Sequence, residues 1–207
     1  MADWVAISSL ATAGGTLALA ATTYASVRSS SRSARSAERS LLADLRPLLI
    51  QSSPDDAVQR IGFADGVFVT APGGAVGVEV VDRRLYLVAS LRNVGPGIGV
   101  LDGGFVAPEV RMSLQDHEPV ASFRMLTRDI YIPPGKVGFW QVAFRDEDAG
   151  RAELLEAVER GEFAMEILYG DYEGGQRMIS RFNVYREDGV WRHSVVRHWR
   201  IDHVGPR

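Results

Sequence analysis

The sequence predicts a mainly β protein: an antiparallel β-sandwich with one short helix, preceded by a long N-terminal helix. Three observations lead to this fold class. Residues 4–27 carry no charge, and an arginine-rich stretch follows them. From Pro47 onward, short apolar runs alternate with turn-forming residues at roughly 8–12-residue intervals, as in sandwich domains. The predicted organisation is a transmembrane helix over 1–27, a basic juxtamembrane helix over 28–46 and a sandwich domain over 47–207.

The uncharged stretch has the length of a membrane span. It covers 24 residues, and a bilayer core of about 30 Å takes roughly 20 residues of helix. Trp4 and Tyr24 lie near its two ends, where aromatic rings suit the lipid–water interfaces. A signal peptide and a soluble helix or oligomer stalk remain alternatives. The arginines follow the apolar run instead of preceding it, and no polar face interrupts it, so the span is favoured.

Small residues recur at four-residue spacing within this stretch. Gly14, Ala18 and Thr22 share one face of a helix, with Gly15 beside them. Small residues let membrane helices approach closely, so this face is a candidate for helix association with a partner or a second copy. The alternative is that an alanine-rich composition supplies small residues by default.

Five arginines follow the span on one stripe of the predicted helix, with only Glu38 and Asp44 opposing them. Basic residues beside a span stay in the cytoplasm, which predicts a single-pass protein of the cell membrane with its N-terminus outside. These arginines are also candidates for contact with anionic lipid, although a plain stop-transfer signal would explain them equally. Pro47 should end the helix. The stripe comprises Arg28, Arg32, Arg35, Arg39 and Arg46.

The domain beyond Pro47 is predicted to consist of short strands and one helix. Residues 53–66 are expected to form a loop, and Asp102, Gly103 and Gly104 to interrupt the chain. Asp146–Asp148 are expected to cap a helix over 149–160 that Gly161 ends. The expected strands are 47–52, 67–70, 76–81, 85–92, 109–114, 130–132, 136–145, 163–169, 177–185 and 190–203.

Several segments resemble a loose group of uncharacterised bacterial single-span membrane proteins with an Arg/Ser-rich juxtamembrane helix. The similar segments are the arginine helix ending in "RP", then "LRNVGPGIGV", "PPGK" and "YGDYEGGQR". The resemblance implies an immunoglobulin-like sandwich for the soluble part. It implies no activity, because the group has no common function.

Composition and motifs do not favour an enzyme. The chain has no cysteine, which excludes disulfides, thiolate catalysis and cysteine-bound metals. Residues 47–207 hold 18 basic and 23 acidic residues, so no nucleic-acid surface is expected. His193, His198 and His203 are five residues apart, which on a regular strand places neighbours on opposite faces. Asp171 and Glu173 suit a solvated turn better than a cation site. We therefore expect no cofactor, metal or catalytic residue.

The C-terminal segment combines arginines and histidines with Trp191 and Trp199. This pattern predicts an edge strand, because charge discourages pairing between sheets. Contact with lipid or RNA is the alternative for such a basic, aromatic segment. The sequence thus predicts a membrane-anchored protein-interaction module, with a structural subunit of a membrane complex and, less favoured, a membrane-bound enzyme as alternatives.

Overall fold

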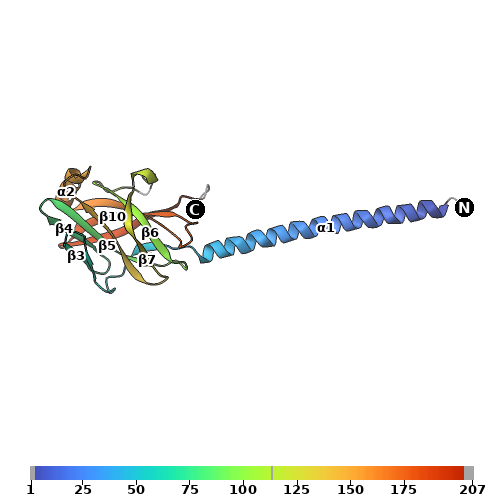
Figure 1. Ribbon diagram of the computed structural model, residues 1–207, viewed down its shortest axis with the longest axis horizontal. Helices are drawn as coiled ribbons and strands as arrows, with labels where there is room; N and C mark the ends of the chain where they lie inside the picture. Colours follow the sequence, from blue (N-terminus) through green and yellow to red (C-terminus); the bar gives the residue numbers. More distant parts are fainter. Residues whose placement is uncertain (1–2, 113, 203–207) are drawn as a thin grey trace. The chain divides into compact units, whose positions relative to one another are not determined.

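The computed structural model describes residues 3–112 and 114–202, and the side chains of residues 3–12, 18, 39 and 43 are not described. The chain divides into two compact units, Met1–Ala43 and Asp44–Arg207 (Figure 1).

The first unit is built from a single helix, α1 (Asp3–Asp44), which runs without a break through 42 residues. It passes from the uncharged stretch into the arginine-rich stretch and ends before Pro47, as predicted. The described apolar side chains of its uncharged stretch, such as Leu17 and Leu19, are exposed. No helix in the described part of the chain is both long and apolar enough to cross a membrane. The span over 4–27 stays a prediction.

The second unit contains two main antiparallel sheets and a hairpin. In the smaller sheet, β1 and β4 pair with successive parts of one edge of β5, and β8 pairs along the other edge. The larger sheet has the order β11-β10-β9-β6-β7. The elements are β1 (Leu49–Gln51), β2 (Gln59–Gly62), β3 (Phe68–Ala71), β4 (Val76–Val81), β5 (Arg84–Asn93), β6 (Gly99–Ala107), η1 (Val120–Ser122), β7 (Arg124–Ile132), β8 (Val137–Phe144), α2 (Arg151–Arg160), β9 (Glu162–Gly170), β10 (Met178–Glu187) and β11 (Val190–Arg200).

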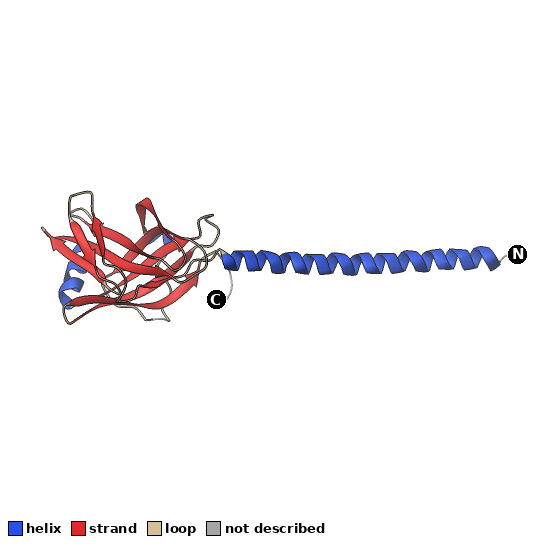
Figure 2. Ribbon diagram, turned by 90° about the horizontal axis from the view of Figure 1, so that it is seen from below, coloured by secondary structure: helices blue, strands red, loops and turns tan. Residues whose placement is uncertain are grey.

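Residues of both sheets make up the main core. Figure 2 shows the strands of the β domain in red. Leu87 and Trp140 come from the smaller sheet, and Ile167 and Phe182 come from the larger one; all four are almost fully buried. Burying each such side chain contributes about 1.5–3 kcal/mol. Gly104 makes room for the indole of Trp140, because a Cβ there would overlap the ring. The mainly β, antiparallel fold is therefore confirmed, whereas the immunoglobulin-like topology stays a prediction.

Most predicted turns are confirmed in detail. Asp82 and Arg83 join β4 and β5 with φ values of 49° and 62°. Both residues thus lie in the left-handed region that a tight two-residue hairpin requires. Gly161 ends α2 at φ 92°.

Four expectations about helices, strands and loops were wrong. Asp102–Gly104 do not break the chain, because β6 continues through them with a bulge between Leu101 and Gly103. The described residues of 109–114 form no strand, because Arg111 pairs with the Asn183 side chain of the larger sheet instead. The expected loop 53–66 contains β2, which pairs with β3. Asp146–Asp148 do not cap α2 with a side chain; its N-cap is Gly150, and Asp148 instead pairs with Arg124.

A bulge in β11 overturns the expectation for the histidines. The register of β11 against β10 shifts so that Val196 has no partner residue. His193 is then opposite Val184 and His198 opposite Ser180, two positions on the same face of β10. The bulge therefore places both histidines on one face, not on opposite faces. His203 lies outside the described residues.

His193 is buried between the sheets beside the ring of Phe182, at a centroid distance of 5.5 Å. Neither ring nitrogen has a hydrogen-bond partner among the described residues. Burial lowers the pKa of His193 to about 4, and a backbone contact with Ser90 offsets only part of this effect. The folded state therefore holds the imidazole neutral.

This pKa predicts an acid-sensitive stability. Above pH 6.5 the free energy of unfolding should be highest, because His193 is then neutral in the unfolded chain as well as in the folded one. It should fall as the pH drops from 6.5 to about 4, by about 3 kcal/mol in total. Urea unfolding between pH 7.5 and about 4.5 checks this.

His193→Gln should remove most of that pH dependence, since glutamine does not titrate. His117→Gln is the matched control and should keep it, because His117 is only partly buried. An unchanged slope in His193→Gln would show that other groups control the acid response.

Candidate functional site

A loop covers the outer face of the larger sheet. We call residues 108–119 the cover loop; residue 113 within it is not described. Asn183 on β10 holds its first part: its side chain accepts from the Arg111 N–H at 3.0 Å and donates to the Arg111 carbonyl at 3.1 Å. The backbone of Arg111 is therefore hydrogen-bonded as in a β-strand, but its partner is the Asn183 side chain and not a neighbouring strand.

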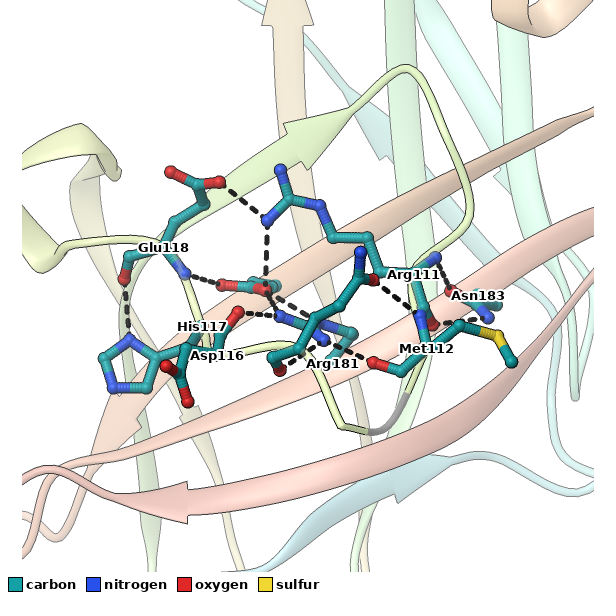
Figure 3. A network of polar contacts seen from close by, with 9 residues as sticks. Arg111, Met112, Asp116, His117, Glu118, Arg181 and Asn183 are labelled. Atoms are coloured by element: carbon teal, nitrogen blue, oxygen red, sulfur yellow. Dashed lines mark hydrogen bonds and ion pairs between the residues drawn. The ribbon is translucent and has the colours of Figure 1, made fainter.

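A buried ion pair holds the rest of the cover loop (Figure 3). Arg181 on β10 and Glu166 on β9 are 0% and 1% exposed, and the guanidinium Nη2 lies 2.6 Å from the carboxylate. The same guanidinium donates to the carbonyls of three loop residues, Met112, Gln115 and Asp116. It also lies 4.7 Å from the ring centre of Trp199.

The cover loop also donates a hydrogen bond to the Glu166 carboxylate and forms an ion pair with it. The Glu118 N–H donates to Glu166 at 2.9 Å. The Arg111 guanidinium pairs with the carboxylates of both Glu118 and Glu166, at 2.6 and 3.8 Å. A buried charge is costly unless its hydrogen-bonding capacity is satisfied. Because the loop supplies that satisfaction, the ion pair and the cover loop require each other.

A groove runs along the second half of β11, next to the cover loop. Its volume is about 830 Å³. Arg46 and Leu48 line it before β1, Leu114 lines it from the cover loop, and Met178 lines it from β10. We call it the β11 edge groove; its lining residues are Arg46, Leu48, Leu114, Met178, Val195, Val196, Arg197, His198, Trp199 and Arg200.

The lining shows that the groove follows the edge of a strand. Six consecutive residues, Val195–Arg200, contribute to it. Successive side chains of a strand point to opposite faces of the sheet, so a cavity on one face would be lined by alternate residues only. β11 is the end strand of its sheet, and a cavity along that end can meet both faces.

The β11 edge groove is apolar and positively charged. Three arginines and one histidine line it, together with six apolar side chains, and no carboxylate is among the ten lining residues. Partial burial lowers the pKa of Arg46, and the neighbouring charge of Arg200 lowers it further. Two guanidinium groups held near each other favour an anionic group between them.

His198 is fixed by a row of hydrogen bonds that leads into the core. Its Nδ1 lies 2.6 Å from the hydroxyl of Ser180, which lies 2.8 Å from the hydroxyl of Tyr169. The Tyr169 hydroxyl in turn accepts from the Leu49 N–H, and burial raises its pKa to about 12. Ser180 is fully buried, so its hydroxyl cannot attack a substrate in the groove. The row orients the histidine ring.

A second cleft, of about 700 Å³, is lined by charged residues of both signs. Three of its four carboxylates pair with arginines: Asp146 lies 2.9 Å from Arg84, and Asp65 lies 3.1 Å from Arg145. Asp148 similarly pairs with Arg124. These ion pairs are partly exposed, and each of their carboxylates has an arginine partner. This arrangement is typical of a surface charge network with a structural role.

The structure divides the predicted lipid-contact arginines between the two units. Arg28, Arg32 and Arg35 are exposed on α1, and the side chain of Arg39 is not described. Arg46 lies beyond the end of α1 and lines the β11 edge groove, so it does not continue the helical stripe as predicted. The helix ends two residues earlier, at Asp44.

The predicted association face lies on the uncharged half of α1. Gly14 and Gly15 have open space where a Cβ would stand, and the Thr22 hydroxyl donates to the carbonyl of Leu19 at 2.9 Å. The side chain of Ala18 is not described. Helix association through this face stays a prediction.

The acidic turn is exposed at Glu173, as expected, but not at Asp171. Asp171 is 4% exposed and accepts from the backbone N–H groups of Glu173 and Gly175 and from the side chain of Gln176. Its carboxylate therefore shapes the turn. Among the described residues, no group of three or more histidine, aspartate or glutamate side chains is placed to hold a metal ion.

Sequence reasoning missed the Arg181–Glu166 pair. The available signal was a charged residue at an apolar-strand position in each of two consecutive strands, "FAMEILY" and "MISRFNV". Charged residues are rarely fully buried unless they are paired, so these two positions could have been matched.

The chain was compared with protein-family models, with curated proteins and with solved structures. None of the three comparisons finds a match.

Replacing Arg181 should destabilise the domain strongly. Arg181→Met leaves Glu166 buried without its main partner and frees three loop carbonyls, so we expect a loss of about 3–5 kcal/mol in the free energy of unfolding. Arg186→Met, on the same strand but exposed, should change it by less than about 0.5 kcal/mol. Urea unfolding at pH 7.5 measures both. Equal stabilities of the two variants would contradict a central role for the pair.

Proposed function

We propose that this protein is a non-enzymatic binding module, tethered to the cell membrane by α1, whose β domain holds a protein partner in the β11 edge groove. The groove carries this proposal: it is open along a strand edge, apolar on both sides and positively charged. Such a combination of apolar area and a few charged groups is typical of binding surfaces.

The character of α1 supports the tether. Its first half has no charge after Asp3 through Val27, and its described apolar side chains are exposed on the isolated chain. An uncharged helix of this kind needs an apolar environment or a partner helix. Alanine, serine and threonine make it only weakly apolar, so we propose that it enters lipid together with other helices packed on the Gly14 face.

The arginine-rich half of α1 supports one orientation. Arg28, Arg32 and Arg35 are exposed immediately after the uncharged half. Arginines beside a span stay on the cytoplasmic side, which would place the β domain in the cytoplasm. The same exposed arginines can contact anionic lipid headgroups at that surface.

Membrane fractionation tests the tether. The full-length chain should sediment with membranes at high speed, resist extraction at alkaline pH and enter the supernatant with detergent. Leu19→Arg puts a charge at the middle of the uncharged stretch, at a cost of about 2.5–3.5 kcal/mol, and should shift the protein toward the supernatant.

Val80→Arg is the matched control, since Val80 is exposed in the β domain and its replacement should leave the partition unchanged. A wild-type chain that stays in the supernatant without detergent would contradict the membrane tether. If it stays there as an oligomer, the alternative of an assembly subunit joined through α1 would take its place.

A further inference from the structure

The second half of β11 offers a sheet edge to another strand. Among the described residues, β11 ends the five-stranded sheet, and β10 is the only strand that pairs along its length. Near the middle of β11, its other edge approaches the smaller sheet: Arg192 bridges to Ala75, and the Val195 N–H donates to the side chain of Gln51 at 3.3 Å. From Val196 onward, the β11 edge groove runs along that edge.

The bulge at Val196 sets the two halves of β11 apart. A bulge bends its strand and increases the local twist, so the edge beyond it can turn away from the neighbouring sheet. Natural edge strands are usually protected by charge or by a covering segment. Here the charged residues line a groove that has apolar side chains on both sides. The edge can therefore accept a strand of matching charge, whereas other strands are disfavoured.

We infer that the β11 edge groove binds an extended, acidic peptide segment of a partner protein, which adds to the larger sheet as a strand beside Val196–Arg200. This inference rests on the proposed function and names the chemistry of the partner.

Backbone groups would provide the affinity. A strand added to an exposed edge forms main-chain hydrogen bonds with it, and side chains at alternate positions enter pockets on the two faces. Leu114 and Trp199 would meet apolar side chains on the outer face, while Leu48 and Met178 would meet those on the inner face. Strand addition therefore accounts for a groove with apolar walls on both faces of one strand.

The charges would select the partner. Arg46 and Arg200 lie near enough to lower the pKa of Arg46, and both line the groove. A glutamate or aspartate of the added strand would relieve this repulsion and form charge-assisted hydrogen bonds with the guanidinium groups. A basic segment would add to the repulsion, so the groove discriminates by charge.

The buried hydrogen bonds that hold parts of the cover loop would favour binding. Leu114 is 89% exposed and Met112 is 72% exposed, yet the carbonyl of Met112 is held by the buried Arg181. Exposed apolar residues on a loop that is fixed from below are pre-organised, which reduces the entropy lost on binding.

Fluorescence anisotropy with a labelled synthetic peptide tests the inference. The peptide alternates glutamate and valine over roughly eight residues, enough for one strand. The full-length protein is kept in non-ionic detergent. We expect saturable binding, and at least about tenfold weaker binding by Arg46→Glu and by Arg200→Glu. Arg186→Glu, an exposed arginine on β10 outside the groove, is the matched control and should bind as the wild type does.

Two altered peptides identify the mode of binding. A peptide with lysine in place of glutamate should not bind, and a peptide N-methylated at alternate residues should lose binding because it lacks N–H donors for the strand edge. Equal binding of the N-methylated peptide would overturn strand addition. Equal binding of the lysine peptide would overturn charge selection.

Two further outcomes would overturn the inference. In the first, the groove binds neither the peptide nor lipid. In the second, it binds short-chain phosphatidylglycerol but not the peptide, which would identify a lipid site instead. Membrane fractionation of the unmodified chain is independent of these results, so a failed peptide test leaves the tether standing.

Discussion

The buried pair between Arg181 and Glu166 is the interaction on which the site depends. Both charges lie in the outer face of the larger sheet and are almost inaccessible to solvent. Taking two charges out of water is costly, and their attraction compensates only when further hydrogen bonds complete both groups. Three loop carbonyls and one loop N–H provide them, so the sheet cannot keep this pair without the cover loop.

One wall of the β11 edge groove follows from that constraint. The cover loop places Leu114 beside the groove, and the Arg181 guanidinium lies against the ring of Trp199. The other wall is formed by the chain around Leu48. There the backbone N–H of Leu49 starts the row of hydrogen bonds that passes through Tyr169 and Ser180 to His198. The groove thus joins segments that are far apart in sequence and that are fixed by buried polar groups.

Sequence patterns predicted the parts of the domain that depend on local rules. The turn at Asp82-Arg83, the end of α2 at Gly161 and the edge position of the basic C-terminal strand all follow from residues close together in the chain. Residues 109–114 have the composition of a strand, but their backbone is bound by Asn183 and Arg181, about 70 residues away. No local pattern reports such a pairing.

The site was harder to predict for the same reason. The bulge at Val196 inverted the expected faces of His193 and His198, although the alternation rule itself was applied correctly. Arg46 was assigned to the helical stripe by its spacing, yet the helix ends before it and the residue lines the groove instead. Register shifts and helix ends of one or two residues decide which side chains meet, and these depend on tertiary packing.

Amide hydrogen exchange in the unliganded, full-length protein tests most directly whether the edge of β11 is open. If the account is correct, alternate amides within Val196–Arg200 exchange much faster than those of the central strand β9, because β10 can bond only one side of an end strand. Uniform protection of Val196–Arg200 at the level of β9 would contradict it, because the edge would then already be covered.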